Sequence, residues 1–311
     1  MKRLIYRILW RLLAGIGVLW GAATLTFVTI NLTGGDTAIA ILGGAEAVPT
    51  PAVIAHVREE YHLDKPLYEQ YAFYVAKLFR GDLGDSYRLR IPVTQAIGQQ
   101  LEATLTLAVW AGSVTILVSL AIAILTAGRA SWARSISSST ELIVTSMPHF
   151  VGGIVLLLVF SFQLHWLPAS GQNGWKSLVL PTITLALPMI GMLTQVLRNE
   201  LDETLEQPFI VTARARGLSE AGVRLGHALR HALIPVTTLA GTFIGFLLGG
   251  AVIAETLFAR QGVGRLVADA AQGKDVPIVL GVTMLSAVTY VIVNLIVDLL
   301  NGLIDPRARQ M

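Results

Sequence analysis

The side chains that could carry out chemistry in this sequence are few and scattered. Ser161 and His165 are four residues apart, so one helical face could hold them as a Ser–His dyad. His227 and His231 have the same spacing, which suits two metal ligands on a helix. The serine has no Gly-x-Ser-x-Gly turn, and no glutamate follows His227. We therefore interpret the first pair as interfacial polar residues and the second as surface residues, and we predict no catalytic or metal-binding residues in this chain.

The sequence also lacks the motifs for ATP binding and for thiol chemistry. A P-loop requires Gly-x-x-x-x-Gly-Lys-Ser/Thr, and the pair Gly273-Lys274 is followed by Asp275 instead. The chain has no cysteine, which excludes disulfides, thiolate metal sites and cysteine nucleophiles. We expect neither enzymatic activity nor a cofactor in this chain.

The composition predicts an all-α membrane protein. Of the 311 residues, 54% are hydrophobic and only 14% are charged, whereas soluble domains usually carry about 25% charged residues. The formal net charge of +3 is too small to indicate nucleic-acid binding. Six uncharged stretches are long enough to cross about 30 Å of hydrocarbon, and within lipid they must be helices. They lie at 12–35, at 103–128, at 142–164, between Lys176 and Arg198, between His231 and Glu255, and between Asp275 and Asp298.

The placement of charge predicts the topology and limits the energy source. Lys and Arg are concentrated in the two end segments and the even-numbered loops, and they are sparse in the two short loops on the other side. Both termini are therefore predicted to be cytoplasmic. The cores of the spans contain no Asp, Glu, Lys or Arg. This argues against the main alternative function, an ion-gradient-driven secondary transporter, which needs such groups in its spans.

Two hydrophilic segments interrupt the spans. In the outer segment, 36–102, Thr50 can cap a predicted helix that has Pro51 at its first position and runs to Tyr61, and a second helix is predicted to start at Pro66 and end before Gly81. It would form an extracytoplasmic helical cap, which could be a packing accessory or a docking surface for an outside partner. The predicted organisation is 1–35, the N-terminus and first span; 36–102, the cap; and 103–311, a five-helix core.

The second hydrophilic segment is 198–231, on the predicted cytoplasmic side. Pro208 can open a short helix, Gly217 suits the left-handed position that ends it, and Ser219 can cap the next helix. Two short helices in a hairpin could transmit movement into the membrane, or they could be an ordinary solvated loop.

Several short motifs follow one another along nearly the whole chain. They are Leu63-Asp64-Lys65-Pro66-Leu67, Gly81-Asp82-Leu83-Gly84, Leu167-Pro168-Ala169-Ser170-Gly171, Thr212-Ala213-Arg214-Ala215-Arg216-Gly217-Leu218, Glu255-Thr256-Leu257-Phe258 and the stretch from Asn294 to Arg307. Together they resemble ATP-binding-cassette (ABC) importer permeases of the dipeptide/oligopeptide/nickel subfamily. The sequence departs from that family at Gly34-Gly35-Asp36-Thr37, where Pro-Gly-Asp-Pro is usual, and at Gln261, where proline is common.

The resemblance implies a type I ABC importer permease in the bacterial cytoplasmic (inner) membrane. Such a subunit forms half of a translocation path for peptides or small metal chelates. It works with a second homologous permease subunit, two ATP-binding-cassette ATPase subunits and an extracytoplasmic solute-binding protein. The resemblance also implies which positions couple to the ATPase: Ala213, Arg214, Ala215, Arg216, Gly217 and Leu218. It covers systems for dipeptides, oligopeptides, nickel and metallophores, and it names no substrate-binding residues.

Overall fold

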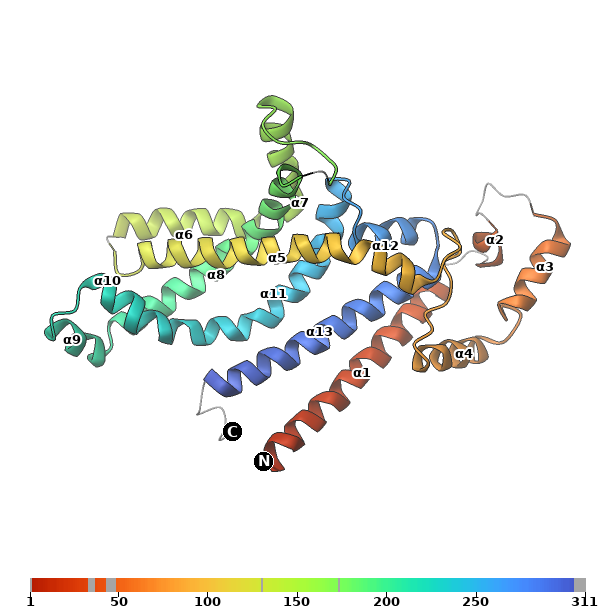
Figure 1. Cartoon of the computed structure of the whole chain (residues 1–311), viewed down its shortest axis with the longest axis horizontal. Coiled ribbons are helices and arrows are strands. Elements are labelled where there is room, and N and C mark those ends of the chain that lie inside the picture. The colour runs from red at the N-terminus through yellow and green to blue at the C-terminus, as the bar shows by residue number, and fades with distance from the viewer. Residues whose placement is uncertain (1, 33–36, 43–48, 130, 173, 305–311) are drawn as a thin grey trace. The chain divides into compact units, whose positions relative to one another are not determined.

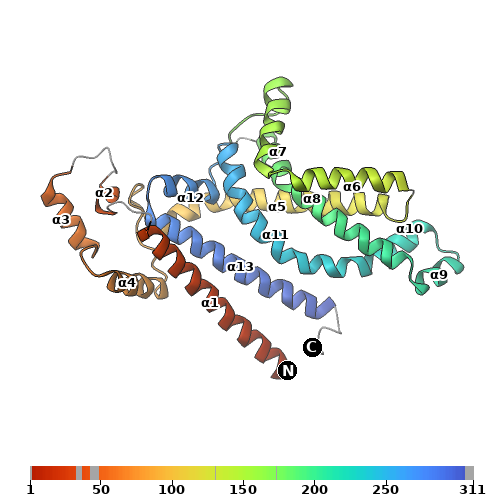
Figure 2. The same cartoon turned by 180° about the vertical axis from the view of Figure 1, so that it is seen from behind.

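The computed structural model describes residues 2–32, 37–42, 49–129, 131–172 and 174–304, and its regular structure there is helical (Figure 1, and from behind in Figure 2). An isolated β-bridge joins Asp85 and Pro92. The helices are α1 (Lys2–Leu32), α2 (Thr37–Ile41), α3 (Pro51–Glu60), α4 (Leu67–Phe79), α5 (Val93–Thr126), α6 (Ser131–Ser146), α7 (His149–Leu156), α8 (Lys176–Leu205), α9 (Pro208–Ala215), α10 (Glu220–Gly222), α11 (Leu229–Leu257), α12 (Val263–Gln272) and α13 (Val276–Ile304), with π-helical segments η2 (Leu157–Gln163) and η3 (Val223–Ala228). The predicted all-α class is confirmed.

Within the described residues, each of the six predicted apolar segments lies mainly on helix. Among the described residues, α5, α8 and Val276–Val297 of α13 are long and apolar enough to cross a bilayer. Shorter apolar stretches, Leu13–Thr29 and Thr242–Leu257, lie in α1 and α11. The end of the first predicted segment and the departure at 34–37 lie largely outside the described residues, as does the end of the C-terminal motif, 305–307.

The third predicted segment, 142–164, is not a single straight helix. Arg134–Ser146 and His149–Gln163 meet at an angle of 101°, and Figure 1 shows α7 turning away from α6. Pro148 lies at the bend with φ −54° and ψ 130°. Proline has no amide hydrogen, and its ring disfavours helical conformation at the preceding residue. The predicted third segment is therefore a helix pair bent at Pro148, and the bend was not predicted because only the absence of charge was considered.

The chain forms two compact units. The first comprises Met1–Thr104 and Gln261–Ile292, and the second comprises Leu105–Arg260 and Val293–Met311. The first unit thus combines the N-terminal segments with a stretch from near the C-terminus. The organisation into 1–35, 36–102 and 103–311 stays a prediction about the chain in its membrane.

The two predicted cap helices form in the first unit. α3 begins at Pro51, but the hydroxyl of Thr50 makes no capping hydrogen bond, so the predicted cap was wrong. α4 follows Pro66 and ends before Gly81, which has φ +73°. Pro51 occupies the first position of α3 as predicted, whereas Pro66 is the residue before α4, which was predicted to start one residue earlier.

One face of α4 packs on α1. The rings of Tyr71 and Tyr74 lie 5.4 Å and 5.8 Å from that of Phe27, centroid to centroid. The Tyr71 hydroxyl also lies 2.6 Å from Oγ1 of Thr24, within hydrogen-bond distance. Burial raises the pKa of Tyr74 to about 12. These contacts bear out the packing role considered for the cap; whether it also docks a partner stays a prediction.

A buried carboxylate holds the end of the cap to the start of α13. Asp275, only 2% exposed, accepts hydrogen bonds from the Ser86 hydroxyl at 2.5 Å and from the backbone amides of Tyr87 and Arg88, both at 3.2 Å. The Ser86 hydroxyl in turn accepts a hydrogen bond from the Leu89 amide. Burial, and next the charge of Asp275, raise the pKa of Tyr87. One side chain therefore organises a turn nearly 190 residues away in sequence.

Replacing Asp275 by alanine is expected to free this turn, because three donors lose a charged acceptor. Losing about 2 kcal/mol would raise the population of the open turn roughly 30-fold. Arg88 and Arg90 in the turn are exposed, so the measurement is the rate of tryptic cleavage after them in the purified protein. The matched control is Asp269→Ala, which removes an exposed aspartate nearby. Equal cleavage rates in the two variants would contradict this role for Asp275.

The second unit is built around α8, which packs against α6, α7 and α11. Two glycines permit these close approaches. A Cβ atom on Gly191 would lie 2.8 Å from Cγ2 of Thr145 in α6, and one on Gly153 in α7 would lie 2.6 Å from Cδ2 of Leu257. Small residues allow membrane helices to approach closely and gain van der Waals contact. The backbone of α6 and α7 is thereby fixed against its neighbours.

Candidate functional site

The segment between α8 and α11 forms the predicted hairpin, but only its first helix, α9, is short, because the second runs without a break into α11. α9 ends at Ala215, and Gly217 follows with φ +82°. The Gly217 amide donates to the Arg214 carbonyl at 2.9 Å, and the Leu218 amide donates to the Ala213 carbonyl at 3.4 Å. This pair of bonds is the Schellman motif, which needs a left-handed residue and therefore favours glycine.

The second helix of the hairpin also starts as predicted. The Ser219 hydroxyl accepts a hydrogen bond from the Gly222 amide at 3.2 Å, which caps α10. α10, η3 and α11 then follow one another without a break, so the backbone stays helical through residue 235 up to Leu257. The side chains of 234 and 235 lie outside the described residues.

The six residues that the resemblance assigned to coupling are contiguous at the tip of the hairpin. Ala213 is buried, whereas the other five are exposed: Arg214, Ala215, Arg216, Gly217 and Leu218. Phe209 and Val211 are exposed on the same short helix, α9. The tip therefore presents apolar and basic groups together, a composition suited to contact with another protein.

Arg214 is held by an ion pair within the hairpin. Its Nε donates to Oε1 of Glu220 at 2.7 Å and its Nη2 to Oε2 at 3.3 Å. The hydrogen bond lowers the pKa of Glu220 below its ordinary value of 4.5 and raises that of Arg214. Both groups are thus charged at neutral pH, and the pair is lost only as the pH falls through the lowered pKa of Glu220. Arg216 has no such pair among the described residues.

A buried apolar cluster packs the hairpin against α8. Ile210 and Ala213 of α9 and Val223 of η3 are each 5% exposed or less, and they pack with Leu201 and Leu205 of α8. Burying these side chains stabilises the hairpin by roughly 1.5–3 kcal/mol for each large one. The hairpin is therefore a packed part of the second unit, which argues against the alternative of an ordinary solvated loop.

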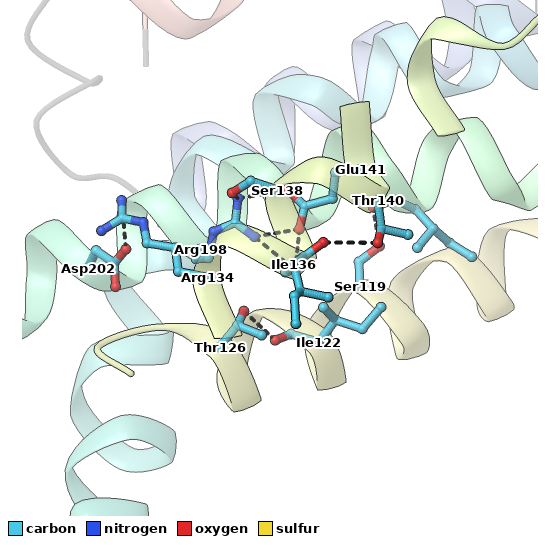
Figure 3. Close-up of polar contacts among 12 residues, drawn as sticks. Ser119, Ile122, Thr126, Arg134, Ile136, Ser138, Thr140, Glu141, Arg198 and Asp202 are labelled. Carbon is cyan, nitrogen blue, oxygen red and sulfur yellow. Dashed lines mark hydrogen bonds and ion pairs between the residues drawn. The ribbon is translucent and has the colours of Figure 1, made fainter. Parts of the chain in front are cut away.

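A buried ion pair joins α6 to α8 (Figure 3). Arg198 is 2% exposed, and its Nη2 donates to Oε2 of Glu141 at 2.7 Å, while Nη1 donates to Oε1. Hydroxyls of Ser137 and Ser138 accept from the same guanidinium at 3.0 Å and 3.1 Å. The pair was not predicted, because Glu141 and Arg198 stand 57 residues apart and merely bounded two apolar runs.

The other candidates, the Ser161–His165 pair and His231, lie outside the hairpin tip. His165 is exposed, and its Nδ1 lies 3.2 Å from the carbonyl oxygen of Gln163, while Ser161 is buried. The ring of His231 lies tilted against that of Phe209, with the two centroids 5.1 Å apart. In the described ranges, no group of three or more His, Cys, Asp or Glu side chains is placed to hold a metal ion.

Comparison with known proteins identifies the family. Residues 116–310 match the family described as binding-protein-dependent transport system inner membrane component. A putative peptide transport system permease protein of Brucella abortus is 37% identical over 97% of this chain and 98% of its own length. The glutathione transport system permease protein of Salmonella typhimurium is 35% identical over 97% of this chain and 98% of its own length.

These matches confirm the resemblance drawn from the motifs, since they extend over nearly the whole chain and over the segment that contains the hairpin. They also agree with the apolar helices of a multi-pass membrane protein. The chain belongs to the family of inner membrane components of binding-protein-dependent transport systems, the type I ABC importer permeases.

Proposed function

We propose that this chain forms half of the path by which an ABC importer takes up peptides. The observation that carries the proposal is similarity over almost the full length to permeases named for peptide and for glutathione, which is itself a short peptide. Both names favour peptides over the nickel chelates and metallophores that the wider subfamily transports.

The assembly proposed for this chain contains a second homologous permease subunit, two ATP-binding-cassette ATPase subunits and an extracytoplasmic solute-binding protein. The family description supports a binding protein as one component. ATP and Mg²⁺ would be bound by the ATPase subunits, because the P-loop pattern is missing here. The distribution of Lys and Arg supports cytoplasmic termini and, with them, a hairpin on the cytoplasmic side, where ATP is available.

The residues proposed to couple to the ATPase are Ala213, Arg214, Ala215, Arg216, Gly217 and Leu218. Three observations support this role: five of them are exposed, the Schellman turn fixes their backbone, and the cluster beneath them is buried. A short helix that is exposed on one face and packed on the other can be pushed by a partner and move as a rigid element.

The proposal is tested by purifying the tagged chain from its host in mild detergent and identifying what accompanies it. We expect one ABC ATPase or a pair, a second permease and a solute-binding protein, and mass spectrometry of the ligand on that binding protein is expected to show short peptides. A single discrete metal chelate would overturn the substrate class. A complex without any ATPase would contradict the importer itself and favour the gradient-driven alternative.

A further inference from the structure

The C-terminal end of α5 is bound to the hairpin through one arginine. Nη1 of Arg224, in η3, donates to the carbonyl oxygen of Ile124 at 3.0 Å and to that of Ala127 at 2.5 Å. These residues are about 100 positions apart in sequence. The Arg224 side chain is only 12% exposed, so these bonds are largely shielded from water.

The end of α5 is open to such a contact because its own last hydrogen bonds are redirected. A helix leaves its last four carbonyls without partners inside the helix. The amide of Gly128, which could bond back to Ile124, donates instead to Oδ1 of Asp202 in α8 at 2.6 Å. The guanidinium of Arg224 therefore satisfies free carbonyls and places a positive charge at the negative end of the helix dipole.

Apolar packing reinforces this junction. Ala123 and Ala127 are 0% and 1% exposed, and they belong to the same buried cluster as Ile210 and Val223 of the hairpin. Gly128 has φ +58°, and a Cβ atom there would lie 3.3 Å from Nη2 of Arg224. The end of α5 thus packs against both the hairpin and the end of α8.

Charged side chains connect the tip of the hairpin to the end of α5. Arg214 pairs with Glu220 at 2.7 Å, and the other carboxylate oxygen of Glu220 lies 3.9 Å from Nε of Arg224. Arg224 then bonds the carbonyls at the end of α5. From there α5 continues as one 34-residue helix back to Val93, a length of about 50 Å.

We propose that Arg224 is a positioning residue that fastens α5 to the hairpin, so that a displacement of the hairpin by the ATPase is passed to α5 and not lost in local rearrangement. This inference rests on the proposed function, since it needs an ATPase that moves the hairpin. On this proposal α5 is the span that moves with the hairpin, and Glu220 connects Arg214 at the tip to Arg224.

The experiment measures peptide uptake and ATP hydrolysis in the reconstituted importer, and takes the ratio of ATP hydrolysed to peptide imported. Arg224→Met keeps the aliphatic stem and removes the donors. It is expected to raise this ratio about tenfold, because a charge-assisted hydrogen bond is worth about that factor in an equilibrium. Arg224→Lys, which keeps a charged donor, is expected to recover most of the coupling. Arg129→Met, which removes an exposed arginine just beyond the end of α5, is the matched control and is expected to leave the ratio unchanged.

A purely structural role for Arg224 would reduce the amount of assembled importer without changing the ratio per assembled complex, and that result would overturn the proposal. The second variant, Glu220→Gln, changes an exposed side chain and so leaves the buried cluster intact. It is expected to raise the ratio about threefold, and a wild-type ratio there would remove Glu220 from the link. If the wild-type importer shows no ATP-driven uptake, the proposed function fails. If wild type and Arg224→Met couple equally well, that function stands and this inference alone is wrong.

Discussion

Replacing Arg198 by leucine while Glu141 is kept is expected to destabilise the protein by about 3–5 kcal/mol, because a carboxylate is left buried without its cation. Glu141 is only 7% exposed, and two of its charge-assisted hydrogen bonds come from Arg198. The measurement is the free energy of unfolding in mixed micelles, followed by tryptophan fluorescence. A second readout is the amount of folded protein that can be extracted from the membrane.

The matched control removes both charges. Arg198→Leu combined with Glu141→Leu is expected to be markedly more stable than Arg198→Leu alone, since a buried ion pair can be replaced by apolar side chains at little net cost. A single variant as stable as wild type, or a double variant as unstable as the single one, would show that the pair does not hold α6 to α8.

Replacing Gly217 by leucine is expected to lower peptide uptake about tenfold. The φ of +82° costs a branched side chain roughly 1–2 kcal/mol, so the Schellman turn at the hairpin tip would give way to another conformation. A Cβ atom at this position meets nothing within 4 Å. Folding and membrane insertion are therefore expected to survive, and the measurement is uptake per assembled importer.

Asparagine is the matched control at this position, because it tolerates the left-handed region far better than other residues with a side chain. Gly217→Asn is expected to keep most of the uptake. If the leucine variant transports like wild type, or if asparagine is as harmful as leucine, then the backbone at Gly217 is not what presents the tip to the ATPase.

Features of the fold that depend on neighbouring residues could be predicted from the sequence. Pro51, Pro66 and Gly81 mark the cap helices, and Gly217 and Ser219 mark the hairpin, because each acts on its own backbone within a turn. The bend at Pro148 was missed for a different reason. The apolar run was long enough for a membrane span, and the prediction did not take into account that a proline disfavours helix at the residue before it.

The candidate site likewise has one part that a local motif predicts and another that depends on long-range contacts. The six residues at the tip are consecutive, so a motif could identify them. The contacts of Arg224 and Asp202 with the end of α5 span 74 to 100 residues and require the helices to be packed first. Nothing in the local pattern distinguishes Arg224 from Arg230, although only the former bonds the carbonyls of α5 among the described residues.

The energy source is measured by peptide uptake into proteoliposomes that contain the importer, with binding protein on one side and ATP supplied or withheld on the other. We predict that uptake requires ATP on the side of the ATPase subunits and continues after an uncoupler collapses the proton gradient. Uptake that continues without ATP and stops with the uncoupler would contradict the account and show a gradient-driven transporter.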